Sequence, residues 1–535
     1  MKFFNNAGPI KTDIHYNIDP IERLDKKELL YLIDSQKYFI LHAPRQTGKT
    51  STLLALRDFL NKEGRYHCVY ANFEAGQAAR DDIEMGMKSI LGEIERRIGL
   101  MDENLLKLWP DSAAIMAKVG ATGALAAALA FFCEKLKKPL VFLIDEIDSL
   151  VGDTLISVLR QIRSGYDTRP AAFPQSIILC GLREVRDYRI YSDTEKAIIT
   201  GGSAFNIKSE SLRMGDFKLD EVKRLYIQHT EYTGQKFEED IWDYVWELTE
   251  GQPWLVNTLA YEACFRIEKD RSKLITRDII ERAKEHIIIN RMTHIDILID
   301  KLREERVRRV IEPMLASADG ANFNESDVSY VIDLGLIKRK EGPGGPRGNY
   351  RISNGIYKEV IPRELVYADQ YGITNDTPWY VDGGRLNMAK LLTDFQKFYR
   401  ENSEIWLERY EYKEAGPHLI LMAFLQRVVN GGGRIFREYG LGRRRMDIMV
   451  DFGGEKHCIE LKVYRGAQPG YDEEGDTKAA YERVLNKGME QLKEYMDKCG
   501  AREGHLLIFD RAPGKLWRDR IFSRPAAGGI TVWGA

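Results

Sequence analysis

Three charged residues near the carboxyl-terminal end of the chain have the types and spacing of a metal-dependent hydrolytic site. Asp447 is followed after twelve residues by Glu460, and Lys462 stands two positions further on. Side chains alternate across a β-strand, so Glu460 and Lys462 should share one face of their strand. The Gly-Gly turn between the two acids predicts a hairpin that brings Asp447 and Glu460 to one Mg²⁺ ion. Such an ion polarises a phosphate and activates water, and Lys462 would stabilise the developing negative charge.

A helical stretch downstream adds polar residues to this predicted site. Gln491 and Tyr495 stand one helical turn apart, on a helix whose other positions include apolar residues for packing on the sheet. A further acidic residue is expected before Asp447. Glu438 is the first candidate for it, and Glu414 is the alternative.

Basic residues gather around these acids although the formal net charge of the whole chain is −2. A near-neutral chain can contact nucleic-acid phosphates only through a local patch of positive charge. The alternative is a solvated hairpin with unrelated charges. The residues of the predicted patch are Arg427, Arg434, Arg437, Arg443, Arg444, Arg445, Arg511, Lys515, Arg518 and Arg520.

A second set of residues, far upstream, has the pattern of a phosphate-binding loop. The sequence A-P-R-Q-T-G-K-T-S lies between a short apolar run and a helical stretch. In such a loop backbone N–H groups hold phosphates, the lysine reaches the β- and γ-phosphates, and the next hydroxyl binds Mg²⁺. Alanine replaces the first glycine of the usual motif, so the turn there should differ. The residues predicted to bind ATP are Ala43, Pro44, Arg45, Gln46, Thr47, Gly48, Lys49, Thr50 and Ser51.

An apolar run that ends in two acids supplies the expected partner of this loop. Asp145 and Glu146 follow directly after Leu140–Ile144. We expect Asp145 to hold Mg²⁺ together with Thr50, and Glu146 to orient or deprotonate the attacking water. Arg183, just after a later apolar run, is a candidate sensor of the γ-phosphate, and the alternative is an ordinary surface charge.

The pattern of elements predicts an α/β protein followed by helices. Short apolar runs alternate with helical stretches over the first part, which is typical of a doubly wound sheet. Helical periodicity begins at Leu219 and predicts a helical lid that ends at about Asn290. Residues 295–365 look like a small helical unit closed by a hairpin, which suggests a winged helix. The predicted strands of the sheet are Tyr38–His42, Tyr66–Phe73, Leu140–Ile144 and Ser176–Cys180.

Two resemblances to known families follow from these motifs. Residues 10–365 resemble the AAA-like/STAND group of P-loop ATPases through APRQTGKTS, LIDEID, TEGQPWLV and DLGLI…ISNGIYKEVI. Gly251-Gln252-Pro253 resembles the Gly-x-Pro element of the signal-transduction ATPases. Residues 411–524 resemble the PD-(D/E)XK nucleases through D-x12-E-x-K and Q-x3-Y, the last element being like that of RecB-type nucleases.

The first resemblance implies ATP and Mg²⁺ as cofactors, hydrolysis linked to conformational change, and a homo-oligomer. Such oligomers complete the site with an arginine of a neighbouring subunit, which this sequence does not identify. The second implies a nucleic-acid substrate, DNA in preference. The expected fold is therefore a P-loop ATPase core with a helical lid and a winged helix, plus a C-terminal α/β nuclease-like domain. The predicted boundaries are 1–215 for the core, 216–293 for the lid, 294–366 for the winged helix, 367–410 for a connector and 411–535 for the nuclease-like domain.

Composition agrees with a multidomain protein of the cytoplasm. A chain of 535 residues should divide into about three to five domains. Its six scattered cysteines lack a C-x2-C pair, which favours a reducing compartment over zinc or disulfides. The start has no apolar signal core, and the Ala-rich stretch Val119–Cys133 is too short to cross a bilayer, so we expect a buried helix there and no membrane partner.

These predictions combine into an ATP-controlled, Mg²⁺-dependent DNA endonuclease, with roles in defence or mobile-element control among those that fit. A second hypothesis is a nucleotide-dependent switch or scaffold whose nuclease-like domain binds nucleic acid or a partner without cleaving. A third is a translocating helicase–nuclease, which would need an oligomeric ring.

Overall fold

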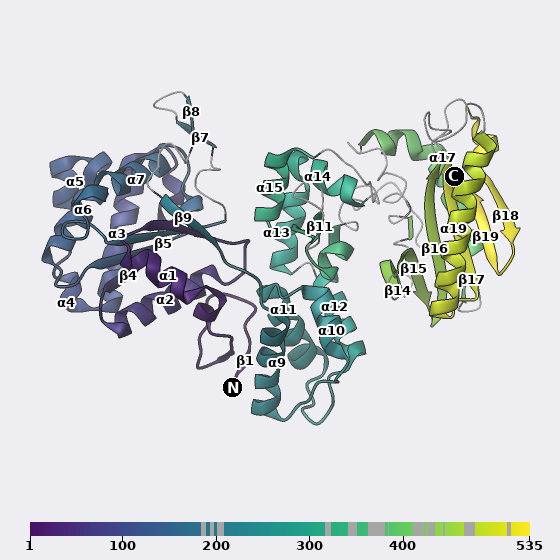
Figure 1. Cartoon of the computed structure of the whole chain (residues 1–535), viewed down its shortest axis with the longest axis horizontal. Coiled ribbons are helices and arrows are strands. Elements are labelled where there is room, and N and C mark those ends of the chain that lie inside the picture. Colours follow the sequence, from purple (N-terminus) through teal and green to yellow (C-terminus); the bar gives the residue numbers. More distant parts are fainter. Residues whose placement is uncertain are drawn as a thin grey trace. The chain divides into compact units, whose positions relative to one another are not determined.

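The computed structural model divides into two compact units, Met1–His294 with Ile332–Gly335, and Ile295–Val331 with Leu336–Ala535 (Figure 1). The structure describes residues 1–182, 189–192, 197–200, 208–290, 292–315, 323–340, 350–361, 380–382, 385–409, 421, 424–425, 434–441, 444–464, 477–510 and 515–535.

A five-stranded parallel sheet forms the centre of the first unit. The order of its strands is β4-β5-β6-β3-β9, and every neighbouring pair is parallel. The four strands predicted from apolar runs are confirmed to within two residues at either end. The strands are β3 (Tyr38–His42), β4 (His67–Asn72), β5 (Leu140–Asp145), β6 (Ser176–Gly181) and β9 (Lys208–Arg213).

Helices cover both faces of this sheet because its strands are apolar on both sides. Alternate residues of β3 show the pattern, since Phe39 packs in one apolar cluster and Ile40 in the other. One face lies against α1 (Lys26–Asp34) and α2 (Lys49–Glu63). The other lies against α3 (Ile83–Met101), α5 (Ser112–Val119), α6 (Ala121–Lys135) and α7 (Gly152–Ser164), with the short α4 (Glu103–Leu106) between them.

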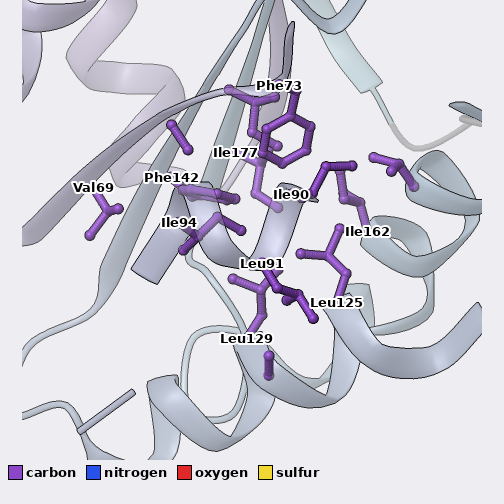
Figure 2. Packing of buried hydrophobic residues seen from close by; sticks show 14 of the residues in the cluster. Val69, Phe73, Ile90, Leu91, Ile94, Leu125, Leu129, Phe142, Ile162 and Ile177 are labelled. Atoms are coloured by element: carbon purple, nitrogen blue, oxygen red, sulfur yellow. The ribbon is translucent and has the colours of Figure 1, made fainter. Parts of the chain in front are cut away.

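The apolar cluster on the α3 and α7 face of the sheet includes residues of the Ala-rich stretch Val119–Cys133. Leu125 and Leu129 of α6 are buried beside Leu91 of α3, and Phe142 of β5 lies in the same cluster (Figure 2). The prediction of a buried helix there is confirmed. None of the helices in the described ranges is both long and apolar enough to span a lipid bilayer.

A helical lid completes the first unit, and the beginning of the chain packs on it. Phe4 of β1 (Phe3–Phe4) contacts the rings of Tyr226 and His229, and β1 pairs in parallel with β2 (His15–Tyr16). The first residues, which the sequence assigned to the core, therefore pack on the lid. Its helices are α9 (Leu219–Thr233), α10 (Ile241–Thr249), α11 (Pro253–Tyr261) with a π-helical extension (Glu262–Ile267), and α12 (Arg277–Ile289).

The second unit begins with three helices and a two-stranded antiparallel ribbon. Helices followed by a two-stranded ribbon agree with the helical unit and hairpin expected for residues 295–365. The tip of the hairpin, Glu341–Gly348, lies outside the described residues. The elements are α13 (Thr293–Leu302), α14 (Glu305–Leu315), α15 (Glu325–Asp333), β10 (Ile337–Arg339) and β11 (Tyr350–Ile352).

A six-stranded mixed sheet with the order β14-β15-β16-β17-β19-β18 ends the chain. The first three strands are antiparallel neighbours, and β17 runs parallel to β16 because α19 (Thr477–Cys499) crosses between them. The strands are β14 (Arg434–Leu441), β15 (Arg444–Phe452), β16 (Glu455–Tyr464), β17 (Glu503–Asp510), β18 (Phe522–Ala526) and β19 (Ile530–Gly534).

Helices pack on both faces of this sheet. Leu492 of α19 is buried against one face, together with Leu506. On the other face, Phe395 of α17 (Met388–Arg409) contacts the ring of Phe509, and the Gln396 side-chain amide donates hydrogen bonds to two carbonyl groups of the C-terminal strands. These contacts place α17, which the sequence assigned to a connector ending at residue 410, against the C-terminal sheet. The predicted domain boundaries stay predictions.

Candidate functional site

The loop between β3 and α2 has the geometry that phosphate binding needs. Gly48 takes a left-handed conformation with φ of 89° and is the N-cap of α2, which begins at Lys49. The α2 N-terminus therefore points its free N–H groups into the loop. Ala43, in place of the usual glycine, does not have a positive φ, and Gln46 takes the second left-handed position with φ of 57°. This explains how the loop accommodates alanine.

The lysine of the loop is buried and bonds to the loop itself. Lys49 is 7% exposed, and its ammonium donates hydrogen bonds to the carbonyl groups of Ala43 and Pro44, each at 3.1 Å. A cation held by two neutral carbonyls can exchange them for phosphate oxygens, which bind it more strongly. The predicted phosphate role of Lys49 is therefore compatible with the position of its side chain.

The predicted pair of magnesium ligands is in contact across the sheet. Strand β6 separates β3 from β5, yet Thr50 Oγ1 donates a 2.7 Å hydrogen bond to Asp145 Oδ2. The Tyr70 hydroxyl donates to the same oxygen at 3.0 Å, and the Asp145 side chain is fully buried. The strand order thus brings together a hydroxyl and a carboxylate that are 95 residues apart.

Glu146 lies at the mouth of the same site in a strained conformation. Its φ of 52° is unusual for a residue other than glycine. Burial raises the pKa of Glu146, and the nearby Lys49 ammonium opposes that shift. A carboxylate with a raised pKa is suited to accept a proton from water, and the predicted catalytic role of Glu146 stays a prediction. Arg183, the candidate γ-phosphate sensor, lies outside the described residues.

The loop opens into a cavity of about 280 Å³ between the core and the lid. Sequence reasoning missed most of its walls, because they come from segments without a motif. Trp254 of α11 donates an indole hydrogen bond to the Asn6 carbonyl at 2.9 Å, and Ile10 N donates to Ser51 Oγ at 3.0 Å. The lining residues are Asn5, Asn6, Ala7, Gly8, Pro9, Ile10, Ile18, Pro20, Arg23, Gln46, Gly48, Lys49, Thr50, Ser51, Glu146, Phe217, Pro253, Trp254 and Asn257.

Arg23 is a second cation at this cavity. Its guanidinium donates hydrogen bonds to the carbonyl groups of Thr47 and Gly215 and lies 4.9 Å from the centre of the Phe217 ring. Burial lowers the pKa of Arg23 to about 10, so the side chain stays charged at neutral pH. The arginine therefore ties the phosphate loop to the segment that enters the lid.

In the C-terminal sheet, three acidic residues occupy neighbouring positions on adjacent strands. The paired register of β15 and β16 ends with Ile448 opposite Ile459, and Asp447 and Glu460 are the residues just beyond that last pair. The β14–β15 register, with Arg437 opposite Ile448 and Tyr439 opposite Met446, puts Glu438 opposite Asp447. The side chain of Glu438 lies outside the described residues, as does Glu414 altogether. The backbone register is compatible with Glu438 as the partner of Asp447, and both candidates stay predictions.

The two central acids differ in their surroundings. The ladder between β15 and β16 ends at Ile448, and the Asp447 carboxylate then accepts a 2.8 Å hydrogen bond from Leu461 N. Glu460 is 2% exposed, and burial, with the Asp447 charge as the second cause, raises its pKa to about 7. The Lys462 ammonium opposes this shift through a 2.6 Å hydrogen bond to Glu460 Oε1.

The polar atoms of this group fit a divalent cation. Glu460 Oε2 and Gln491 Oε1 are buried without a hydrogen-bond partner, which is costly unless a ligand completes them. A Cβ added at Gly488 would lie 3.4 Å from Lys462 Cγ, so the turn of α19 before Gln491 lies against Lys462. Oxygen donors of this kind suit Mg²⁺.

Tyr495 and the described residues of the predicted basic patch make contacts other than with Asp447 and Glu460. Tyr495 is 1% exposed and belongs to the apolar cluster with Leu492 and Met496, so it packs the helix on the sheet. Its predicted catalytic role stays a prediction. Lys515 pairs with Asp510 of β17, and Arg518 and Arg520 lie on the short helix α20 (Trp517–Arg520). For the remaining residues of the patch the structure describes the backbone at most.

Comparison with known proteins identifies the first part of the chain. Residues 20–349 match the AAA-like domain family, and the chain belongs to this family. The match includes the phosphate loop, Asp145, Glu146 and the lid, so the chain is an ATP-binding protein of the P-loop ATPase type. It ends before the C-terminal sheet. No protein with a curated description matches the chain.

Several solved structures are similar to the chain. The Walker-type ATPase of Pyrococcus abyssi is 15% identical with a TM-score of 0.46, over 67% of this chain and 99% of that one. Cdc6p from Pyrobaculum aerophilum is 14% identical with a TM-score of 0.34, over 65% and 93%. The RuvB Holliday junction branch migration motor of Thermotoga maritima is 13% identical with a TM-score of 0.32, over 63% and 94%.

Proposed function

We propose that this protein is an ATPase that controls a Mg²⁺-dependent DNA endonuclease domain at its carboxyl-terminal end. The observation that carries the nuclease half is the buried Glu460 carboxylate, which has one unpartnered oxygen, beside Asp447 and Lys462. A protein gains nothing in stability from such a group unless a cation completes it.

In this proposal Asp447 and Glu460 hold Mg²⁺, with Glu438 as a further ligand. The ion, when bound, polarises the scissile phosphate and lowers the pKa of a water molecule. Lys462, which bonds to Glu460 Oε1, would stabilise the negative charge that develops on the phosphate. Gln491 positions the attacking water through its buried carbonyl oxygen.

At the other site, Lys49, Thr50 and Asp145 hold the phosphates and Mg²⁺ of ATP, and Glu146 accepts a proton from the attacking water. The cavity walls supplied by Asn6 and Trp254 receive the rest of the nucleotide. Because these walls come from the lid and the amino-terminal segment, nucleotide binding draws both toward the core. We further propose that the helices and ribbon of residues 295–361 form a winged helix that transmits this movement to the C-terminal domain. We also propose that the protein acts as a homo-oligomer.

The nuclease half is tested with supercoiled plasmid in Mg²⁺ and ATP. Asp447→Asn should reduce cleavage to background, and Lys462→Ala should reduce it about 10²–10³-fold. Asp451→Asn, on the same strand and face but at its hairpin end, is the matched control and should retain cleavage. Cleavage by Asp447→Asn at the wild-type rate would exclude this site and leave a non-cleaving nucleic-acid-binding domain.

The ATPase half is tested by nucleotide binding and phosphate release. Lys49→Ala removes the cation that meets the phosphates, so affinity for ATP should fall at least about tenfold, and hydrolysis should stop. Lys62→Ala, an exposed lysine near the end of the same helix, should behave as wild type. Unchanged hydrolysis in Lys49→Ala would mean that this loop is not the ATP site.

A further inference from the structure

The face of the C-terminal sheet opposite α19 carries metal-ligating side chains that the proposed nuclease chemistry does not use. His457 lies on β16, and Glu503 and His505 lie on β17. The parallel register puts His457 directly opposite Glu503, with His505 two positions further along the same face. The ligand atoms of the three residues lie within 4.8 Å of one another.

The imidazole groups of this cluster are buried and incompletely bonded. His457 is 4% exposed and His505 is 3% exposed. Both ring nitrogens of His457 and Nε2 of His505 have no hydrogen-bond partner. Buried polar atoms are normally satisfied, so three unpartnered nitrogens in one place point to a ligand that completes them.

The third residue gives the cluster access to solvent. The Glu503 side chain is 62% exposed, and its Oε2 lies 3.7 Å from His457 Nδ1, beyond hydrogen-bonding distance. Burial lowers the pKa of His457, and it lowers the pKa of His505 to about 3, with the positive charge of a protonated His457 as a second cause. Both rings are therefore neutral at physiological pH, which is the form that ligates metals.

We propose that His457, Glu503 and His505 bind one first-row transition-metal ion of the Zn²⁺ type, which clips β16 to β17. Two imidazoles and a carboxylate, with a fourth position open to solvent, are a ligand set that zinc uses in proteins. Imidazole ligands select such ions over Mg²⁺. The site is separate from the acids of the proposed nuclease centre, since residues 457 and 460 of β16 point to opposite faces of the sheet.

The ring of His505 gives this site a spectroscopic signature. Trp533 Nε1 donates to His505 Nδ1 at 3.3 Å, a long hydrogen bond. In that arrangement the neutral ring carries its proton on Nε2. When Nε2 binds the ion, the proton moves to Nδ1, and the Trp533 indole N–H must leave that acceptor. Metal binding therefore changes the surroundings of a buried indole.

The test uses the full chain without an affinity tag, stripped of metal by a chelator and titrated with Co²⁺ or Zn²⁺ in excess Mg²⁺, which occupies the proposed carboxylate site around Asp447. One equivalent should bind, with visible Co²⁺ absorption, a change in tryptophan fluorescence and a higher unfolding temperature. Glu503→Gln, a change at an exposed position, and His457→Gln should each weaken binding at least about tenfold. Trp533→Phe should keep the binding and lose most of the fluorescence change.

Two controls separate this site from its neighbours. Asp447→Asn should bind Co²⁺ as wild type does, whether or not the proposed nuclease is active. Thiolate-to-cobalt charge-transfer bands should not appear, which distinguishes the site from Cys458 and Cys499, whose sulfur atoms lie 3.3 Å apart. The proposal is overturned if no equivalent binds, if Glu503→Gln binds as tightly as wild type, or if such bands accompany binding.

Discussion

Asp145 illustrates which functional residues a sequence can reveal. It follows a strand of apolar residues, and its hydrogen bonds with Thr50 and Tyr70 are made possible by strand order alone. Lys49, Thr50, Asp145 and Glu146 could be predicted because their chemistry depends on short local patterns. Arg23 could not, because it reaches the cavity from a segment whose local sequence has no motif, and the TEGQPWLV stretch did not indicate that Trp254 lines the cavity.

The same distinction holds in the C-terminal sheet. The spacing of Asp447 and Glu460 predicted a hairpin that brings the two acids together, and β15 and β16 do pair as antiparallel neighbours up to Ile448 and Ile459. The spacing could not predict that Glu460 is almost fully buried, since burial depends on α19, which is far along the chain.

The burial of Glu460 leads to a pH-dependent prediction for the metal-free protein. Its pKa is raised to about 7 in the folded protein from the ordinary value of 4.5, so the folded state favours the protonated form. The stability that this preference contributes is present below about pH 4.5 and is lost as the pH rises through about 7. Glu460→Gln cannot ionise and should therefore be stabilised relative to wild type by up to about 3 kcal/mol at pH 8, and by much less at pH 5.

The measurement is calorimetric unfolding of the full chain in a chelator between pH 5 and pH 8. Glu455→Gln, which removes a more exposed charge from the same strand, controls for the loss of one carboxylate. A difference between Glu460→Gln and wild type that stays constant over this range would contradict the assigned burial.

At the scale of elements, the strands of the first sheet could be predicted well because each is a continuous apolar run, and the lid helices because their apolar residues recur with the helical period. Helix α17 is the counterexample. Its own sequence predicts a helix, but only contacts such as those of Phe395 and Gln396 show that it packs on the C-terminal sheet. Long-range packing of this kind has no local signal.

The junction between core and lid gives a prediction about one glycine. Gly251 has a φ of 75°, and a Cβ there would lie 1.9 Å from the Phe217 carbonyl oxygen. Gly251→Ala should therefore destabilise the first unit by at least about 2 kcal/mol, through both the left-handed backbone and the clash. ATP affinity should fall as well, because Phe217 lines the cavity and Gln252 reaches the Gln46 carbonyl at 3.5 Å.

Gly234 is the matched control for this change. Its φ of 81° carries the same backbone cost, but a Cβ there would meet nothing within 4 Å. Thermal unfolding and ATP titration of the two variants isolate the Phe217 contact. If Gly251→Ala and Gly234→Ala lower the unfolding temperature and the ATP affinity equally, the junction does not depend on the close contact between Gly251 and the Phe217 carbonyl oxygen.

At the scale of the whole molecule, the chain joins an AAA-like ATPase to a sheet that contains the buried Glu460, and we propose that the first controls the second. Conformational coupling requires that ATP bind two states of the protein with different affinity. The lid and the amino-terminal segment, which both line the nucleotide cavity, are the parts whose positions ATP can bias.

The most direct test of the account is the rate of plasmid cleavage in Mg²⁺ with and without ATP, measured for wild type, Lys49→Ala and Asp447→Asn. We expect wild type to cleave in an ATP-dependent manner, Lys49→Ala to cleave at one rate whether or not ATP is present, and Asp447→Asn not to cleave at all. ATP-dependent cleavage that persists in Lys49→Ala, or cleavage by Asp447→Asn, would contradict the account.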